Sequence, residues 1–140
     1  TLIAILLGPW ASVLIMTTVL TVQCLIFQDG GLTALGANIF NMGVVGGFFG
    51  YYINTIIRLF VQGRKGLFIG SFTAAWCSLV LSATCCAVEL SISGTAPLKI
   101  VLPAMAGIHA VIGIGEGFIT IATLSMLTRV RPDLLELQKI

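Results

Sequence analysis

The sequence predicts an all-α membrane protein, a bundle of about four to five transmembrane helices that is part of a larger helical bundle. Composition is the first observation behind this fold class. Of the 140 residues, 58% are hydrophobic and 9% are charged, and the mean hydropathy is +1.11. Soluble domains carry about 25% charged residues, so this chain has too few charges to cover a surface in water. The second observation is a set of four apolar stretches near the roughly 20 residues that cross a bilayer.

Breaks rich in glycine, proline or charge separate the four stretches, which together form one integral membrane domain. The first follows the Gly8-Pro9 break, and a glycine-rich linker, 28–36, comes after it. A basic linker, 62–66, and a linker of small residues, 91–99, divide the rest. Because irregular backbone cannot face lipid, each stretch is predicted to be a helix. The predicted spans are 10–27, 38–60, 67–90 and 104–127.

The chain begins with Thr1 inside an apolar run. This start has neither a charged segment nor a cleavage site, so we do not expect it to be a signal peptide. We therefore expect residues 1–7 to be the tail of an earlier element, and the chain to be a piece of a longer protein whose N-terminal part is missing.

Positive charge predicts the orientation of the spans, because lysine and arginine concentrate on the cytoplasmic side. Arg58, Arg64 and Lys65 lie at one end of the second span, and Arg129 and Arg131 follow the fourth. An even number of crossings puts the two clusters on one side. We expect a multi-pass plasma membrane protein with this side and the C-terminus in the cytoplasm, and with the 28–37 loop outside.

Small residues recur at a spacing typical of closely packed membrane helices. A phosphate-binding glycine loop would need a strand-to-helix context that this chain lacks. The three GxxxG frames pair Gly43 with Gly47, Gly46 with Gly50 and Gly113 with Gly117.

Cysteine spacing does not favour a thiolate metal site. The four cysteines lie in apolar runs, and none forms a CxxC pair. We interpret them as small packing residues. They are Cys24, Cys77, Cys85 and Cys86.

The segment GIHAVIGIGEG (107–117) places two ionisable side chains inside the fourth span. Glu116 follows His109 by seven residues, so both share one helix face, with Glu116 about 10 Å deeper. Such groups normally face the interior of a bundle. Glu116 reduces its cost by staying protonated or by pairing with donors on other helices, for example Asn54, Thr55 or Ser78. Two interpretations stay open: buried groups that fix helix packing, or a ligand site near the outer face built with His109.

Further polar side chains are predicted at the same outer level. They are Asp29, Asn38, Asn41 and Glu89. Imidazole and amide groups suit a divalent transition metal or its supporting partners. One histidine is nevertheless a weak metal signal, because such sites usually have three or more protein ligands.

Two other function classes are excluded by the composition. No basic run with interleaved aromatic residues is present, so nucleic acid is not an expected partner. One histidine and one glutamate without a nucleophile form no recognisable catalytic unit, so we do not expect an enzyme.

Two segments carry a family resemblance that spans essentially the whole chain. GGLTALGANIFNMGVVGG (30–47) and HAVIGIGEGFIT (109–120) closely resemble signature segments of the CbiM/NikM family, and FQDGG and CAVELSISGT (86–95) fit as well. Members of this family are the substrate-capture membrane components of energy-coupling-factor cobalt and nickel transporters. The resemblance implies a bundle that captures Co²⁺ or Ni²⁺ near the outer face, with no permanently bound cofactor.

The resemblance also implies where the metal ligands lie. In the family a Met-His N-terminus supplies the terminal amine, a backbone nitrogen and the imidazole, and a histidine before the LLGPW segment adds another ligand. These principal ligands are expected upstream of residue 1. His109, Asn41 and Asn38 are carried over as supporting residues, and Glu116 and Glu89 as structural polar residues in the membrane.

The implied partners are a transmembrane coupling subunit, cytoplasmic ATPase subunits and membrane lipid. No segment resembles a nucleotide-binding motif, so ATP hydrolysis is assigned to other subunits. The alternatives are a vitamin-capturing subunit of the same transporter class and a structural membrane subunit without a ligand. Cobalt and nickel are not distinguished, because both accept nitrogen ligands.

Overall fold

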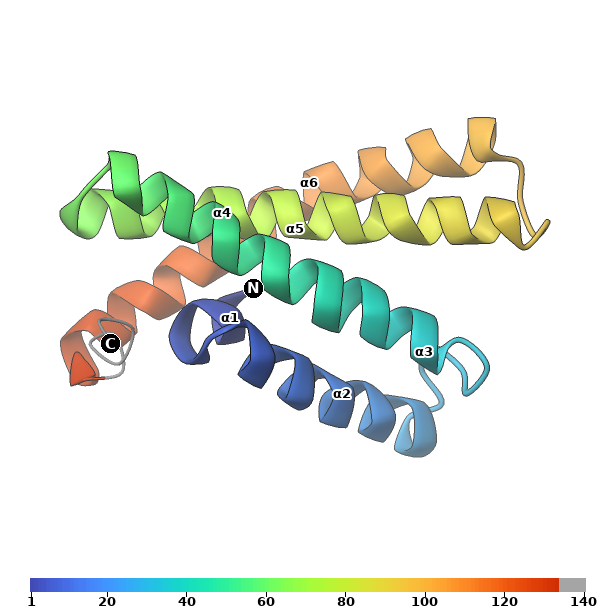
Figure 1. Ribbon diagram of the computed structural model, residues 1–140, viewed down its shortest axis with the longest axis horizontal. Coiled ribbons are helices and arrows are strands. Elements are labelled where there is room, and N and C mark those ends of the chain that lie inside the picture. The colour runs from blue at the N-terminus through green and yellow to red at the C-terminus, as the bar shows by residue number, and fades with distance from the viewer. Residues whose placement is uncertain (134–140) are drawn as a thin grey trace.

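A computed structural model of the chain describes residues 1–133 and contains helices but no strands in that range (Figure 1). One of them, η1, is a π-helix, and it joins α3 to α4 without a break. The predicted all-α membrane fold is confirmed. The helices are α1 (Leu2–Leu7), α2 (Pro9–Ile26), α3 (Leu35–Asn38), η1 (Ile39–Val45), α4 (Gly46–Phe60), α5 (Gly63–Ile92) and α6 (Leu98–Val130).

Three of the described helices, α2, α5 and α6, are each long and apolar enough to cross a membrane. The predicted span 38–60 corresponds to η1 and α4, which follow α3 in one continuous helical run. The π-helical turns divide that run into shorter pieces, so none of them reaches this length alone. The number of spans therefore stays a prediction.

Helix α6 begins earlier than the sequence suggested. The predicted span starts at 104, but the helix starts at Leu98 and keeps Pro103 inside it. Proline costs least near a helix start, where few carbonyls lose a partner. His109 therefore lies about three turns into the helix, deeper than the one and a half turns expected.

The two ends of the bundle differ in charge. The connection between α4 and α5 lies at the same end as the C-terminal end of α6 (Figure 1). Arg58, Arg64 and Lys65 therefore share an end of the bundle with Arg129, as alternating crossings require. We call this the basic end. The connections after α2 and between α5 and α6 lie at the opposite end (Figure 1).

Close helix packing is observed at all three glycine frames. A Cβ atom on Gly117 would lie 2.5 Å from Phe72 Cδ2, and one on Gly113 would lie 2.9 Å from Trp76 Cδ1. These contacts seal α6 against α5. In the other frames Gly43 and Gly47 face α2, Gly46 faces α5 and Gly50 faces Thr1.

The apolar core lies where α1 meets the larger helices. It is formed by buried residues of α1, α5 and α6, with partly buried side chains of α1, α4 and α5 around them. The short helix α1 thus anchors the start of α2 to the α5–α6 hairpin. The buried core residues are Ile5, Leu67, Ala74 and Leu124.

Candidate functional site

Asn41 and Glu89 meet between η1 and α5. Asn41 is only 4% exposed, and its Nδ2 donates to Glu89 Oε2 at 2.7 Å. The Ser82 hydroxyl donates to the backbone carbonyl of Asn41 at 2.7 Å. A hydrogen bond to a carboxylate is stronger than one between neutral groups. We call this pair the Asn41–Glu89 contact, and it holds the π-helix against α5.

The Asn41 amide is not fully satisfied by this contact. Its Oδ1 atom is buried and has no hydrogen-bond partner within the described residues. A buried acceptor without a donor is costly, so such an atom marks a place where a further group would bind favourably. The π-helical backbone points the same way, since short π-helical turns occur frequently at functional sites.

Asn38 lies one turn before Asn41, but its side chain contacts a loop. Its Nδ2 donates weakly to the Gly30 carbonyl at 3.5 Å. A Cβ atom on Gly30 would come within 2.6 Å of that nitrogen, so glycine lets the loop approach. Asp29, next to this glycine, is exposed. The structure therefore brings Asn38 to the 28–34 loop, not to the Asn41–Glu89 contact.

His109 has a defined tautomer. Its Nδ1 lies 2.7 Å from the backbone carbonyl of Met105, which only accepts, so Nδ1 carries the proton. The Nε2 lone pair is left available on a half-buried ring. A histidine held by a backbone carbonyl through one nitrogen is typical of metal-binding and metal-supporting histidines.

The structure does not bring His109 to the outer polar group. The next residue, Ala110, accepts a hydrogen bond from Trp76 Nε1 at 2.9 Å, which fixes the level of His109 beside α5. The Trp76 backbone lies beside Gly113, so His109, one turn earlier on the antiparallel α6, is level with α5 about one turn beyond Trp76. Glu89 lies about nine residues further along α5, a distance of roughly 14 Å. The expectation of one shared level is therefore wrong, because α6 starts earlier than expected.

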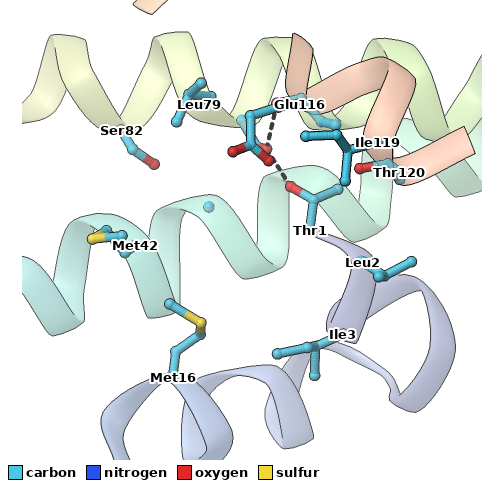
Figure 2. Close-up of a pocket in the computed structure, with 13 residues that line it drawn as sticks. Thr1, Leu2, Ile3, Met16, Met42, Leu79, Ser82, Glu116, Ile119 and Thr120 are labelled. Atoms are coloured by element: carbon cyan, nitrogen blue, oxygen red, sulfur yellow. Dashed lines mark hydrogen bonds between the residues drawn. The ribbon is translucent and has the colours of Figure 1, made fainter. Parts of the chain in front are cut away.

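Glu116 lines a cavity of about 390 Å³ between the helices (Figure 2). The side chain is exposed, and its carboxylate points into the cavity (Figure 2). It has no hydrogen-bond partner among residues 1–133. Other polar or soft groups on the walls are Ser82 and Thr120, and the thioethers of Met16 and Met42.

The donors proposed for Glu116 from the sequence are engaged elsewhere. Asn54 donates to Ser71 Oγ at 3.0 Å. Thr55 bonds to a carbonyl of its own helix, and Ser78 shares a hydrogen bond with Thr1. Pairing of Glu116 with any of these three side chains is therefore not observed.

Sequence reasoning named Ser78 but missed Ser71 and Ser82, which share its face of α5. Ser71, Ser78 and Ser82 are all buried, and they contact α4, Thr1 and η1 respectively. Their spacing of seven and four residues is that of one helix face, which is the signal that would have found them. Ser78 and Ser82 of this face line the cavity that Glu116 also lines.

The described residues do not form a complete metal site by themselves. No three or more His, Cys, Asp or Glu side chains converge within residues 1–133. All four cysteines are free. The candidate site is thus a set of supporting groups: the Asn41–Glu89 contact, the oriented His109 and the Glu116 cavity.

Comparison with known protein families gives a match that spans almost the whole chain. Residues 1–134 match the model of the CbiM family, described as the cobalt uptake substrate-specific transmembrane region. The match includes every described helix.

Two curated relatives are similar over nearly all of the chain. A putative fused nickel transport protein NikMN of Archaeoglobus fulgidus is 43% identical over 137 residues, 96% of this chain and 45% of the relative. The cobalt transport protein CbiM of Sorangium cellulosum is 34% identical over 142 residues, 96% of this chain and 61% of the relative. The chain therefore spans about half the length of these relatives.

Solved structures show the same fold. A crystal structure of a transition metal transporter aligns with a TM-score of 0.84 at 33% identity, covering 93% of this chain and 62% of that chain. A second, of a truncated transition metal transporter, aligns with a TM-score of 0.84 at 31% identity, covering 92% of this chain and 65% of that chain.

Proposed function

Because the chain belongs to the CbiM family of cobalt uptake transmembrane regions, we propose that it captures Co²⁺ or Ni²⁺ at the outer face of the membrane for ATP-driven uptake. The observation that carries this proposal is the family match over residues 1–134. The names of the relatives, which are cobalt and nickel transport proteins and not enzymes, agree with it. The coupling subunit and the cytoplasmic ATPase subunits are the proposed partners.

His109, Asn41 and Asn38 are proposed to support the metal site, whose principal ligands lie upstream of residue 1. The Nε2 of His109 and the unsatisfied Oδ1 of Asn41 support this role, because each is an acceptor that a metal-binding N–H group could donate to. Glu89 orients the Asn41 amide through its carboxylate.

Metal uptake with a His109→Ala variant of the full-length protein tests this proposal. Supporting partners typically contribute 10–100-fold in affinity, so we expect uptake of radiolabelled Co²⁺ or Ni²⁺ to fall about tenfold or more at an unchanged membrane level. Ile108→Ala is the matched control, since Ile108 is the exposed neighbour on α6. Unchanged uptake in His109→Ala would contradict the supporting role, and loss of the protein itself would point to a packing role.

Two binding measurements separate the rival functions. Residues 1–140 alone are expected to bind Co²⁺ or Ni²⁺ no better than about micromolar, because a tight site needs several convergent ligands. Calorimetry in detergent measures this, and a nanomolar dissociation constant would place the site inside this chain. A full-length protein that binds a vitamin but neither metal would favour the vitamin-capturing alternative, and one that binds neither would favour a structural subunit.

The basic end is proposed to face the cytoplasm. Single cysteines introduced at Arg64 and Thr33, with the native cysteines replaced, test this in intact cells. A membrane-impermeant thiol reagent is expected to label position 33 and not position 64. The reverse pattern would invert the proposed topology.

A further inference from the structure

We propose that the turn between α4 and α5 binds the headgroup of an anionic phospholipid, with the lipid chains against the apolar side chains beside it. We call this turn, residues 59–65, the basic turn. The inference is independent of the proposed function, because it involves no metal and holds for either orientation of the protein. Three observations carry it: the position of two cations, the tight geometry of the turn and the exposed apolar side chains next to it.

The two cations of the basic turn stand where a helix disfavours positive charge. Arg64 and Lys65 lie in the first turn of α5, which contains no acidic side chain and has no side-chain cap. Both are exposed, and neither forms an ion pair or a side-chain hydrogen bond within residues 1–133. Cations at the positive end of a helix dipole weaken the helix, so we infer that these two serve an anion outside it.

The acidic side chains of the protein do not neutralise this charge. Of those among residues 1–133, only Asp133 lies at the basic end, and it pairs with Arg131 at 2.8 Å. Asp29 follows α2 and Glu89 is in the last turn of α5, both at the opposite end (Figure 1). Glu116 lies within α6. The charge of the basic turn is therefore available to a partner.

The shape of the basic turn is set by close backbone packing. Only Val61 and Gln62 separate α4 from α5. A Cβ atom on Gly66 would lie 1.6 Å from the Val61 carbonyl oxygen, so only glycine allows this approach. The cations of α5 are thereby held close to the last residues of α4, which are Leu59 and Phe60.

The apolar side chains at the end of α4 favour a lipid as the partner. Phe60 is 84% exposed and Leu59 is 72% exposed. At the end of a membrane helix such side chains meet acyl chains, while lysine and arginine extend to the phosphates. Clusters of these cations beside a membrane helix are typical of binding to anionic lipid. Free phosphate or an acidic protein surface would satisfy the charges but would leave the phenylalanine uncovered.

Native mass spectrometry of the full-length protein in an uncharged detergent tests the proposal. Phosphatidylglycerol is titrated against the protein, and phosphatidylcholine, which has the same chains and no net charge, is titrated in parallel. The wild type is expected to bind phosphatidylglycerol at least several-fold more tightly. Inorganic phosphate is added as a competitor in a third series and is expected to leave the bound lipid in place.

Charge variants locate the binding to the basic turn. Arg64→Gln combined with Lys65→Gln is expected to weaken phosphatidylglycerol binding roughly twentyfold, since each cation contributes about fivefold. Arg64→Lys combined with Lys65→Arg keeps both charges and should retain the lipid. Lys99→Gln is the matched control, because it removes an exposed cation from the first turn of α6 at the opposite end.

Apolar variants test the contact with the lipid chains. Phe60→Ser is expected to weaken phosphatidylglycerol binding several-fold. Ile92→Ser removes a side chain that is 82% exposed at the far end of α5 and should leave the binding unchanged.

Thermal unfolding of the double glutamine variant without lipid separates a lipid site from a role in the fold. We expect it to be at least as stable as the wild type, because the positive end of α5 loses two cations. Phosphatidylglycerol should raise the unfolding temperature of the wild type and not that of the variant. A variant that is less stable without lipid would overturn the inference, since Arg64 and Lys65 would then serve the fold.

Three further outcomes would overturn the inference. Equal affinity for the two lipids, or an equal loss in Lys99→Gln, would reduce the binding to general adsorption. Displacement of the lipid by inorganic phosphate would make the turn a site for the free anion. A double glutamine variant that keeps the lipid but no longer copurifies with the proposed coupling subunit would assign the turn to an acidic protein surface.

Discussion

Glu89 and Glu116 are both carboxylates on the α5–α6 hairpin, yet their surroundings differ. Glu89 accepts a hydrogen bond from the buried amide of Asn41, and this bond joins two helices. Glu116 points into a cavity and has no hydrogen-bond partner in the described part of the chain (Figure 2). A membrane helix can thus carry a carboxylate either as part of a fixed helix contact or beside an open space. The first arrangement supports stability, and the second is suited to binding.

Gly117→Leu is expected to have the largest effect, because it would separate the two helices that carry both carboxylates. Its Cβ would lie 2.5 Å from the Phe72 ring, so α6 could no longer pack against α5. We expect a loss of stability of about 3 kcal/mol or more, at the upper end of overpacking effects. Thermal unfolding in detergent, followed by size-exclusion chromatography, measures it.

The matched control for this change is Gly115→Leu. A Cβ atom on Gly115 would meet nothing within 4 Å, so the same increase in size should be tolerated. Equal stability of the two variants would show that the α5–α6 seam does not depend on glycine.

Asn41→Ala tests the Asn41–Glu89 contact, in which the carboxylate is held by a hydrogen bond. It leaves Glu89 without its donor, and we expect a loss of about 1–2 kcal/mol, since interhelical hydrogen bonds in membranes rarely exceed that range. Asn38→Ala, which removes a long and exposed hydrogen bond, should cost much less. A double-mutant cycle with Glu89→Gln measures the coupling, and strictly additive effects would show that the two side chains do not stabilise each other.

Glu116→Gln tests the carboxylate that points into the cavity. Thermal unfolding in detergent with no metal present measures its effect on stability. Because no hydrogen bond is lost, we expect a change in stability below about 0.5 kcal/mol, as for a substitution away from packing and pairing. A loss greater than that of Asn41→Ala would reverse the comparison, since Glu116 would then be the better paired of the two carboxylates.

Asp133 is a third carboxylate, exposed to water, and its substitution is expected to have the smallest effect on stability. Arg131 donates hydrogen bonds to it at 2.8 and 2.9 Å, which lowers the pKa of Asp133 below its ordinary value of 3.8. The pair's contribution is therefore present above pH 3.8 and is lost as the pH falls through the lowered pKa.

Both groups of this pair are well exposed, so its contribution to stability is minor. Thermal unfolding of Asp133→Asn at neutral pH should match the wild type within error. A clear loss at neutral pH, absent at pH 2, would show that the exposed pair matters more than its setting suggests.

The helical membrane fold could be predicted because it depends on length and hydropathy, which are local properties. The start of α6 could not, because proline is compatible with both a linker and an early helical turn. The glycine frames correctly predicted close helix packing, but the sequence does not indicate which helix each glycine faces. That choice depends on the arrangement of the whole bundle.

The candidate site was predictable only in part. The Asn41–Glu89 contact joins two residues that the sequence had grouped by level, whereas His109 on α6 lies roughly 14 Å deeper along the hairpin. The donors expected for Glu116 were chosen by residue type, but each had a nearer acceptor. Residue type indicates what a side chain is able to bind, and distances between helices decide what it does bind.

The π-helix η1 also sets the rotational phase of the second half of its helical run. A turn closed by i to i+5 hydrogen bonds holds about one residue more than an α-helical turn. If the same residues formed a regular α-helix throughout, Asn41 would turn by about 100° relative to Gly46 and Gly50. Asn41 would then face away from Glu89 while the glycines kept their contacts. The π-helical turns are thus what allows Asn41 to face Glu89 while Gly46 and Gly50 keep their contacts with α5 and Thr1.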